Sequence, residues 1–508
     1  MTSRHRLPEV PARARRAGTL AVAVGIAIVV GAAGAGAQVA PGRDTDSIDI
    51  TGRQNLTLGS GARAYGMGGA FLARADDATA ASWNPAGLSY LRQPEVTLVG
   101  VHNSFDTQRP SAENLLQQEN DSFIGGAIDF AALTWPVAIG EVSGAVQVSY
   151  QRAISFDGRR RIDVYGQPKG QLPDGGTEEV APAFDPTETI LLQQTNGSSD
   201  GGFDVVAFGT GLRLSRRVRA GFTVNRWTNG YDQALERNYL DPTDPTRRPV
   251  REFTLDFRPE GWSFNLGVIY TPVEQFNLAA TYKTAPGTDL RLDKARRDTW
   301  GPPGVVEETT TNGYSNPDAG LDLPSSYGFG VSWRPRDTLT VSADFTRTRW
   351  SQSRIEGYFD LAVTPQDDED GNPSPAPAPV IRPALQYPTL RDPTVELFAQ
   401  REAQQLRLGV EYVFLASRLK IPLRLGYFSD RQITPNPAGD VPRFNGLTAG
   451  IGVVLGSMLL DVAYVYEFGE YSVSAESVGE SETAAPIRYA LTTNRVYASM
   501  IYRFRGRP

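Results

Sequence analysis

The sequence predicts an all-β protein, a 14-stranded antiparallel transmembrane β-barrel with an N-terminal hatch inside its lumen. Three observations support this fold class. Apolar residues recur at every second position in many segments, short and long connections alternate between those segments, and the chain starts with a segment typical of export. A period of two places one face of each strand on lipid and the other on the lumen, as in outer-membrane barrels.

Residues 1–37 are predicted to be a signal peptide. Five arginines precede an apolar run over 17–34, and Ala35-Gly36-Ala37 offers the small residues of a cleavage site before Gln38. An uncleaved anchor helix is the alternative, since the run approaches the roughly 18 to 20 residues that span a bilayer. The many small residues and the A-x-A ending favour cleavage.

The hatch is expected over residues 38–93. Fourteen strands enclose a lumen that side chains alone cannot fill, because about eight strands already leave room for side chains or one small ligand. Residues 61–91 are rich in Gly and Ala and lack the alternation of a strand. Their glycines permit tight turns, and Asp76 and Asp77 can bond local amides. We therefore expect this segment to lie inside the barrel as a plug.

The barrel is expected over residues 94–508. In one of its clearest segments a single face carries Leu406, Leu408, Val410, Tyr412 and Phe414. The predicted strands are 95–103, 124–136, 142–156, 203–214, 217–230, 251–271, 275–292, 325–335, 337–350, 403–415, 419–432, 444–456, 458–472 and 494–505. Their even number is typical of bacterial single-chain barrels.

The predicted connections between these strands alternate in length. Short ones fall at 137–141, 215–216, 272–274, 336, 416–418 and 457. Long ones fall at 104–123, 157–202, 231–250, 293–324, 351–402, 433–443 and 473–493. Short turns at one end and long outer loops at the other are typical of outer-membrane barrels. A soluble β-sandwich is the alternative, but its turn signals would be spaced more evenly.

The composition makes an enzyme improbable and predicts no metal or cofactor. The chain has no cysteine and only two histidines, His5 and His102, so thiolate sites are impossible and multi-histidine zinc sites and Ser-His-Asp catalysis are nearly excluded. Removal of residues 1–37 leaves 45 Lys and Arg against 56 Asp and Glu. Such an acidic chain is not expected to bind nucleic acid.

Residues 61–91 resemble the N-terminal hatch of the FadL/TodX family of outer-membrane transporters for hydrophobic compounds. The matching residues are Arg63-Ala64-Tyr65, Ala75-Asp76-Asp77-Ala78 and Asn84-Pro85-Ala86. The resemblance implies the outer membrane of a Gram-negative-type bacterium and passive transport of long-chain fatty acids or hydrocarbons. It also implies a path from the outer loops to a luminal pocket near the hatch, and then sideways through a gap in the wall beside a kinked strand.

Two other functions remain open at this point. A PorV-like family of fourteen-stranded barrels also carries a G-x-R-x-x-G-M-G-G-A start, which "GARAYGMGGA" fits. That resemblance implies protein secretion or surface assembly, with protein partners bound through the loops. A general polar porin is the third possibility, and the hatch argues against it. The partners expected for the leading interpretation are a hydrophobic small molecule, outer-membrane lipid and lipopolysaccharide, with the barrel a monomer.

Two groups of candidate site residues follow. The hatch residues Arg63, Tyr65, Asp76, Asp77, Asn84, Pro85 and Ala86 are predicted to control passage, the alternative being that they only hold the hatch together. The second group should point into the lumen and meet a ligand carboxylate. It consists of Arg226, Lys283, Arg347, Arg407 and Arg424. The alternative for these cations is pairing with Asp344, Glu411, Asp461 or Glu467.

Overall fold

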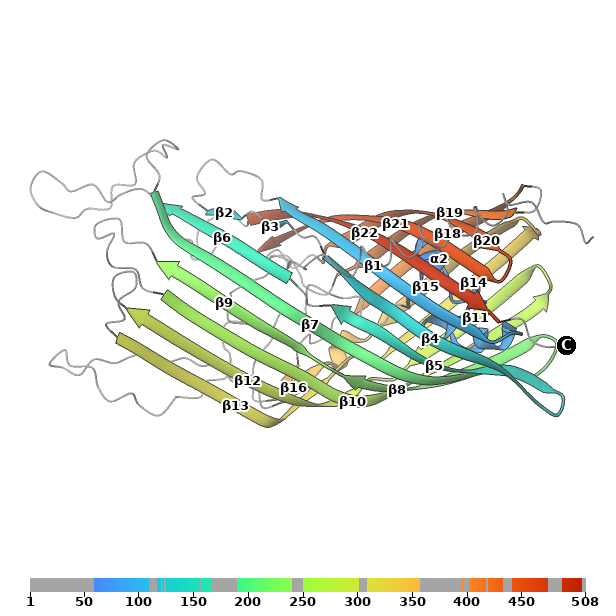
Figure 1. The fold of residues 1–508 in the computed structure, drawn as a ribbon, viewed down its shortest axis with the longest axis horizontal. Coiled ribbons are helices and arrows are strands. Elements are labelled where there is room, and N and C mark those ends of the chain that lie inside the picture. The colour runs from blue at the N-terminus through green and yellow to red at the C-terminus, as the bar shows by residue number, and fades with distance from the viewer. Residues whose placement is uncertain are drawn as a thin grey trace, which may run out of the picture.

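Strands close into one antiparallel barrel around a short segment of the chain (Figure 1). The computed structural model describes residues 59–108, 117–119, 121–122, 125–155, 158–166, 190–239, 250–300, 308–356, 394–396, 402–416, 419–432, 441–473 and 487–504. The predicted signal peptide and residues 38–58 of the predicted hatch lie outside these residues.

Fourteen strands form the closed wall, which confirms the predicted number. In order around the barrel they are β1 (Glu95–Gln108), β4 (Gly125–Ile139), β5 (Val142–Ser155), β7 (Ile190–Arg213), β8 (Val218–Thr228), β10 (Val250–Val273), β11 (Phe276–Lys283), β14 (Ser326–Arg336), β15 (Leu339–Thr348), β18 (Ala403–Ala416), β19 (Leu419–Arg431), β20 (Arg443–Leu455), β21 (Met458–Val473) and β22 (Ile487–Arg503). Each pairs antiparallel with the next. The ladder from Glu95↔Arg503 to Gln108↔Ala490 joins β22 to β1 and closes the ring.

Eight further strands extend the wall at the end with the long connections. They are β2 (Gln117–Glu119), β3 (Asp121–Ser122), β6 (Gly158–Gly166), β9 (Tyr231–Tyr239), β12 (Gly287–Trp300), β13 (Glu308–Asp322), β16 (Arg354–Glu356) and β17 (Thr394–Glu396). β10 pairs with β11 in one half of its length and with β12 in the other, so β12 continues the line of β11 beyond residues 284–286. β9 continues β8 in the same way, because β7 pairs with both.

This extension corrects part of the loop prediction. Residues 157–202, 231–250 and 293–324 were expected to be loops, but they include β6, the first half of β7, β9, the second half of β12 and all of β13. The predicted strand 275–292 is also interrupted between β11 and β12. The physical reason is that strands outside the bilayer need no lipid face. Their sequences, such as "RLDKARRDTW", therefore lose the apolar alternation while keeping the hydrogen-bond ladder.

The outer face of the barrel carries the expected apolar belt. Leu133, Trp135 and Leu425 are 63%, 65% and 67% exposed, although each belongs to a regular strand. The face predicted from the segment near residue 410 is likewise outward, with Leu406, Leu408, Val410, Tyr412 and Phe414 all exposed. Exposed apolar side chains are more stable in the hydrocarbon of a bilayer than in water, so this belt confirms the predicted transmembrane barrel. None of the helices in the described ranges is long and apolar enough to cross a bilayer.

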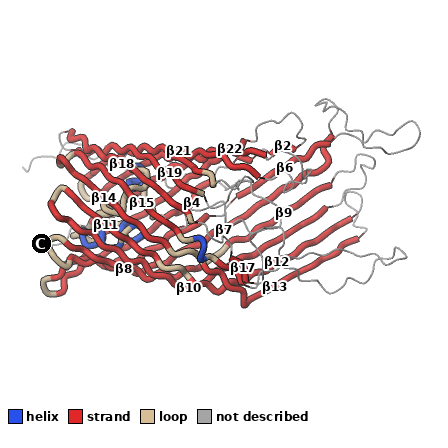
Figure 2. Tube along the Cα trace, turned by 180° about the vertical axis from the view of Figure 1, so that it is seen from behind, coloured by secondary structure: helices blue, strands red, loops and turns tan. Residues whose placement is uncertain are grey.

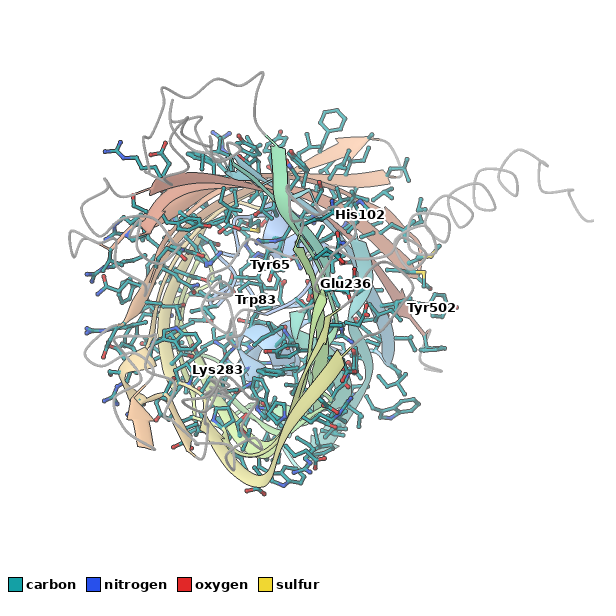
Figure 3. All side chains as sticks on the ribbon, turned by 90° about the vertical axis from the view of Figure 1, so that its left-hand side faces the viewer. Tyr65, Trp83, His102, Glu236, Lys283 and Tyr502 are labelled. Carbon is teal, nitrogen blue, oxygen red and sulfur yellow. The ribbon has the colours of Figure 1, made fainter. Side chains whose placement is uncertain are left out.

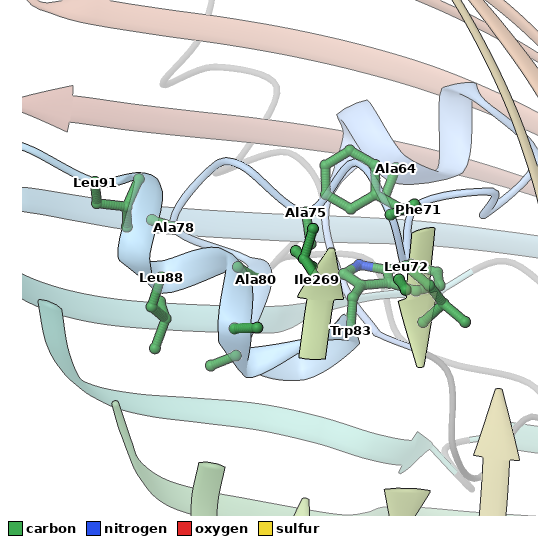
Figure 4. Packing of buried hydrophobic residues seen from close by; sticks show 14 of the residues in the cluster. Ala64, Phe71, Leu72, Ala75, Ala78, Ala80, Trp83, Leu88, Leu91 and Ile269 are labelled. Carbon is green, nitrogen blue, oxygen red and sulfur yellow. The ribbon is translucent and has the colours of Figure 1, made fainter. Parts of the chain in front are cut away.

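Residues 59–91, which we call the luminal segment, lie inside the barrel near its short turns (Figures 1 and 2). The segment contains α2 (Ala62–Gly66), α3 (Ala80–Trp83) and the 3-10 helix η1 (Pro85–Tyr90), and a second 3-10 helix, η2 (Trp350–Gln352), follows β15. α2 packs on β19–β22, and η1 packs on β5, β7, β8 and β10. Phe71 and Trp83 meet edge to face at 6.1 Å in its apolar centre, shown in Figure 4. The main core of the protein therefore lies inside the barrel.

Candidate functional site

On one side, the luminal segment is held to the wall by a buried group of charges. We call it the charge cluster, and it consists of Arg63, Arg74, Asp76, Asp77, Glu411, Arg424 and Asp461. Glu411 on β18 is its centre. Its Oε2 lies 3.2 Å from Arg63 Nε and 2.8 Å from Arg424 Nε, and its Oε1 lies 3.2 Å from Arg74 Nη2. One carboxylate thus joins two arginines of the luminal segment to one arginine of the wall.

Asp76 and Asp77 complete the charge cluster from within the luminal segment. Arg63 Nη1 lies 2.6 Å from Asp76 Oδ1, and Arg74 also contacts Asp76. Asp77 Oδ1 accepts hydrogen bonds from the amide and the hydroxyl of Thr79 and so holds the turn before α3. Burial and the neighbouring Arg63 guanidinium lower the pKa of Arg74 to about 10, so the side chain is still cationic at neutral pH. Arg74 therefore keeps its positive charge beside Glu411 and Asp76.

Other wall side chains bind the backbone of the luminal segment. Asp344 Oδ2 accepts from the amides of Phe71 and Leu72 at 2.6 and 2.7 Å. Thr448 Oγ1 accepts from Gly68 N at 2.9 Å, and Arg407 Nη1 donates to Gly68 O at 3.0 Å. Because an irregular segment inside a barrel cannot satisfy its amides by itself, these contacts fix its position as well as its conformation.

The motif Asn84-Pro85-Ala86 holds the opposite side of the luminal segment. Asn84 Oδ1 caps η1 by accepting from Ala86 N at 3.1 Å, while its Nδ2 donates to Leu72 O at 3.0 Å and to Val268 O of β10 at 3.3 Å. On the wall, this motif contacts the inward-facing Gly221 of β8. A Cβ on Gly221 would lie 2.3 Å from the carbonyl carbon of Pro85, so backbone packs directly on backbone.

Tyr65 forms a third contact between the luminal segment and the wall. Its ring stacks on Tyr497 of β22 with centroids 4.1 Å apart and planes 10° apart, and its hydroxyl donates to Gly59 O at 2.9 Å. Burial raises the pKa of the Tyr65 phenol, which therefore stays neutral. The seven predicted hatch residues thus fall into three places on the wall, and their control of passage stays a prediction.

Three of the five predicted luminal cations do point inward. Lys283 lies on the inner face of β11 and donates from Nζ to Ser82 O at 2.9 Å. Arg407 is bound to Asp430 at 2.9 Å, and Arg424 to Glu411 and Asp461. The last two cations are therefore occupied by carboxylates, which is the alternative that the sequence left open. Of the partners named there, Glu467 binds Arg495 instead.

The inward orientation predicted for Arg226 and Arg347 is wrong. Arg226 shares the outer face of β8 with Phe222, pairs with Glu260 and lies over the ring of Trp262. Arg347 shares the outer face of β15 with Phe345 and pairs with Glu402. Both lie at the end of a barrel strand nearest the extension, where the outer face leaves the apolar belt. A paired cation can be accommodated there, so alternation alone could not decide its direction.

A cavity lies beside the luminal segment on the side of the extension. The empty space at this place, open solvent at the mouth included, is about 670 Å³. Ala81 and Ser82 of the luminal segment border it, and wall residues of six strands complete it, among them Phe130, Gln151, Ala207, Trp227, Asn265 and Lys283. Figure 3 looks along the barrel and shows Tyr65, Trp83 and Lys283 inside the ring of strands. The barrel therefore has a partly open cavity that is bounded on one side by the luminal segment.

The wall loses its pairing next to this cavity. The ladder between β4 and β5 ends at Phe130↔Gln151, and residues 125–129 have no partner on that side among the described strands. Asp129 is the extra residue of a bulge, because β1 pairs through Val99 with Phe130 and through Gly100 with Ile128. Both Phe130 and Gln151 line the cavity. An interruption of the barrel wall thus borders the cavity.

Comparison with known proteins finds similar sequence over part of the chain and similar barrels among solved structures. Residues 255–362 match the family model described as outer membrane protein transport protein (OMPP1/FadL/TodX). A search among curated proteins gives no match. The fold is similar to that of the P. putida toluene transporter TodX, with 12% sequence identity, a TM-score of 0.55, and 89% of this chain and 100% of that chain covered.

Two further structures share the fold. A Pseudomonas aeruginosa FadL homologue has 13% identity and a TM-score of 0.52, with 88% of this chain and 99% of that chain covered. The CymD monoaromatic hydrocarbon channel has 13% identity and a TM-score of 0.51, with 89% and 99% covered. The family match falls on β10–β16, far in sequence from the motifs of residues 61–91, so it confirms the predicted resemblance independently. Residues 255–362 are thus similar to outer membrane protein transport proteins of the OMPP1/FadL/TodX family, and the chain shares the barrel fold of TodX.

Proposed function

We propose that this protein conducts hydrophobic small molecules passively across the outer membrane, with the luminal segment acting as its hatch. The observation that carries the proposal is the cavity, which lies between the luminal segment and a wall whose β4–β5 ladder stops at the cavity edge. The structures with a similar fold support the ligand class, since TodX is a toluene transporter and CymD is a monoaromatic hydrocarbon channel. The proposal includes no catalytic step.

The physical chemistry of the path favours a sideways exit. Straight passage would have to break the charge cluster around Glu411 and the backbone contacts at Gly221. An apolar molecule cannot replace the ion pairs and hydrogen bonds that these groups would lose. It gains roughly 0.8 kcal/mol for each CH₂ moved from water into an apolar environment. The unpaired stretch of wall at residues 125–129 leads from the cavity towards the lipid belt, so no energy source is required.

An Ala207→Trp variant tests the proposal. Ala207 on β7 lines the cavity and is 9% exposed, so an indole there should fill the path and reduce uptake by about tenfold or more. The measurement is uptake of labelled palmitate and labelled toluene by cells or proteoliposomes. Val206→Trp is the matched control, because Val206 is the neighbouring residue and faces lipid. Equal uptake by both variants, or binding of an exported protein in place of uptake, would overturn the proposal.

We further propose that Lys283 receives the carboxylate of an acidic ligand. Lys283 lies at the cavity edge, beside Ser82 of the luminal segment. Lys283→Met keeps the apolar stem and removes the charge, so palmitate uptake should fall about tenfold while hexadecane uptake is unchanged. Arg347→Gln removes an outward-facing charge and serves as the control. A palmitate uptake insensitive to Lys283→Met would contradict this role.

A further inference from the structure

The cavity beside the luminal segment has a polar patch on one part of its wall. Asn225 on β8, Ser263 and Asn265 on β10 and Lys283 on β11 all border the cavity. Another part of the lining is apolar and comes from β4 and β7, with Phe130 as its largest side chain. Covering polar groups with a hydrocarbon is unfavourable when they gain no hydrogen bond. The cavity therefore suits a molecule that has both a polar and an apolar part.

Asn265 differs from its neighbours in this patch. Ser263 Oγ accepts hydrogen bonds from Asn225 Nδ2 at 3.2 Å and from Trp227 Nε1 at 2.8 Å. In the described part of the chain, neither the oxygen nor the nitrogen of the Asn265 side chain has a hydrogen-bond partner. An asparagine side chain offers two N–H donors and one acceptor oxygen. The patch thus presents a donor and an acceptor at the same place, where a ligand can reach both.

The register of β10 and β11 places this amide next to Lys283. Asn265 and Lys283 are directly opposite partners, so their Cβ atoms lie about 5 Å apart. Asn265 shares its face of β10 with Gly267, which packs on Asn84 of the luminal segment, so this is the inner face. Lys283 Nζ donates to Ser82 O at 2.9 Å, and Figure 3 shows Lys283 inside the ring of strands. A carboxylate held at Lys283 therefore has its first carbon atoms within reach of the Asn265 amide.

We propose that the cavity prefers long-chain acids that carry a hydroxyl on the α or β carbon. This inference rests on the transport proposal and on the role of Lys283 stated there. The ligand hydroxyl donates to Asn265 Oδ1 and accepts from Asn265 Nδ2, while the acyl chain lies along Phe130 towards the unpaired residues 125–129. An acid without the hydroxyl covers the same amide and leaves it without a hydrogen bond. A site built around a ligand hydroxyl discriminates against ligands that lack one.

Binding of three acids to the purified protein tests this preference. The acids are palmitate, β-hydroxypalmitate and ω-hydroxypalmitate, and calorimetry measures the Kd of each. The last two acids are isomers, so they differ only in the place of the hydroxyl. The wild type should bind β-hydroxypalmitate about tenfold more tightly than the other two, because one well-placed hydroxyl contributes about this factor.

An Asn265→Leu variant shows whether the preference comes from this amide. Leucine has a similar size and no hydrogen-bonding group, so the Kd values of the three acids should agree within about twofold. Gln404→Leu is the matched control, because it removes an amide from the outer face of β18, and it should keep the preference. Asn265→Ala adds no bulk and repeats the test if the leucine variant does not form a closed barrel.

The outcomes separate this inference from the transport proposal. Equal Kd values of the wild type for β-hydroxypalmitate and ω-hydroxypalmitate would overturn the inference while the transport proposal stands. A preference that persists in both Asn265 variants would do the same. Binding of none of the three acids would refute the role of Lys283 as well, and with it the basis of the inference.

Discussion

A Glu411→Ala variant is expected to release the luminal segment from β18–β21 while its barrel stays folded. The substitution leaves Arg63, Arg74 and Arg424 without their shared carboxylate in a buried place. Removing one partner of a buried ion pair costs roughly 3 to 5 kcal/mol, because the remaining charges stay desolvated. The hydrogen-bond ladder of β18 does not involve this side chain, so closure of the barrel is not affected.

Hydrogen exchange of residues 61–91 measures this release. The opening that exposes their amides should become about 100-fold or more frequent, since each 1.4 kcal/mol corresponds to a factor of ten. Glu260→Ala is the matched control, because Glu260 is an exposed carboxylate that pairs with Arg226 on the outer face. The shift of the barrel on an unboiled gel reports whether the wall is still closed. Unchanged protection of residues 61–91 in Glu411→Ala would refute a role of the charge cluster in docking.

Release of the luminal segment should also change what crosses the membrane. Without it, a lumen enclosed by fourteen strands is wide enough for water and small polar solutes. Cells with Glu411→Ala should therefore become permeable to hydrophilic dyes, whereas cells with Glu260→Ala should not. This readout distinguishes a hatch that closes the barrel from a segment that only lines it.

The barrel could be predicted from sequence because the bilayer imposes a pattern on it. One face of each strand must be apolar, so period-two alternation located all fourteen wall strands and the outward direction of Leu406 and Tyr412. The extension was missed because strands outside lipid have no such constraint. β12 and β13 pair over their whole length, yet their sequences are polar on both faces. Pairing of this kind is decided by the neighbouring strand and leaves little trace in the sequence.

The site was only partly predictable for a related reason. Small residues and the motif Asn84-Pro85-Ala86 identified the segment inside the lumen, but its anchors belong to the wall and are distant in sequence. Asp344 accepts two amides of the luminal segment from 272 and 273 residues away. The inward position of Gly221 could have been noticed, since a glycine between Ala220 and Phe222 interrupts the side chains of a strand. Its partner, Pro85, could not be known without the fold.

A Gly221→Val variant is expected to displace the Asn84-Pro85-Ala86 end of the luminal segment. Any Cβ at position 221 would lie 2.3 to 2.5 Å from Pro85 C, Pro85 O and Ala86 N, which are backbone atoms that cannot rotate away. Val suits a β-strand, so β8 itself should not be weakened. Overpacking of this kind costs roughly 1 to 3 kcal/mol, and the strain falls on η1 because the wall is tied into its ladder on both sides.

The two sides of the luminal segment then give different results for the cargo. Gly221→Val displaces Pro85 and Ala86, which follow Ala81 and Ser82 of the cavity lining by only a few residues. Uptake of palmitate should therefore fall by about tenfold. Hydrophilic dyes should stay excluded, because this substitution leaves the charge cluster intact. Gly287→Val is the control, since a Cβ at Gly287 meets only Asp322 Oδ1 at 3.8 Å. Equal uptake by the two valine variants would mean that η1 is not part of the path. If Gly221→Val instead admits dyes as Glu411→Ala should, the two contacts hold one rigid plug, and passage requires the whole segment to move.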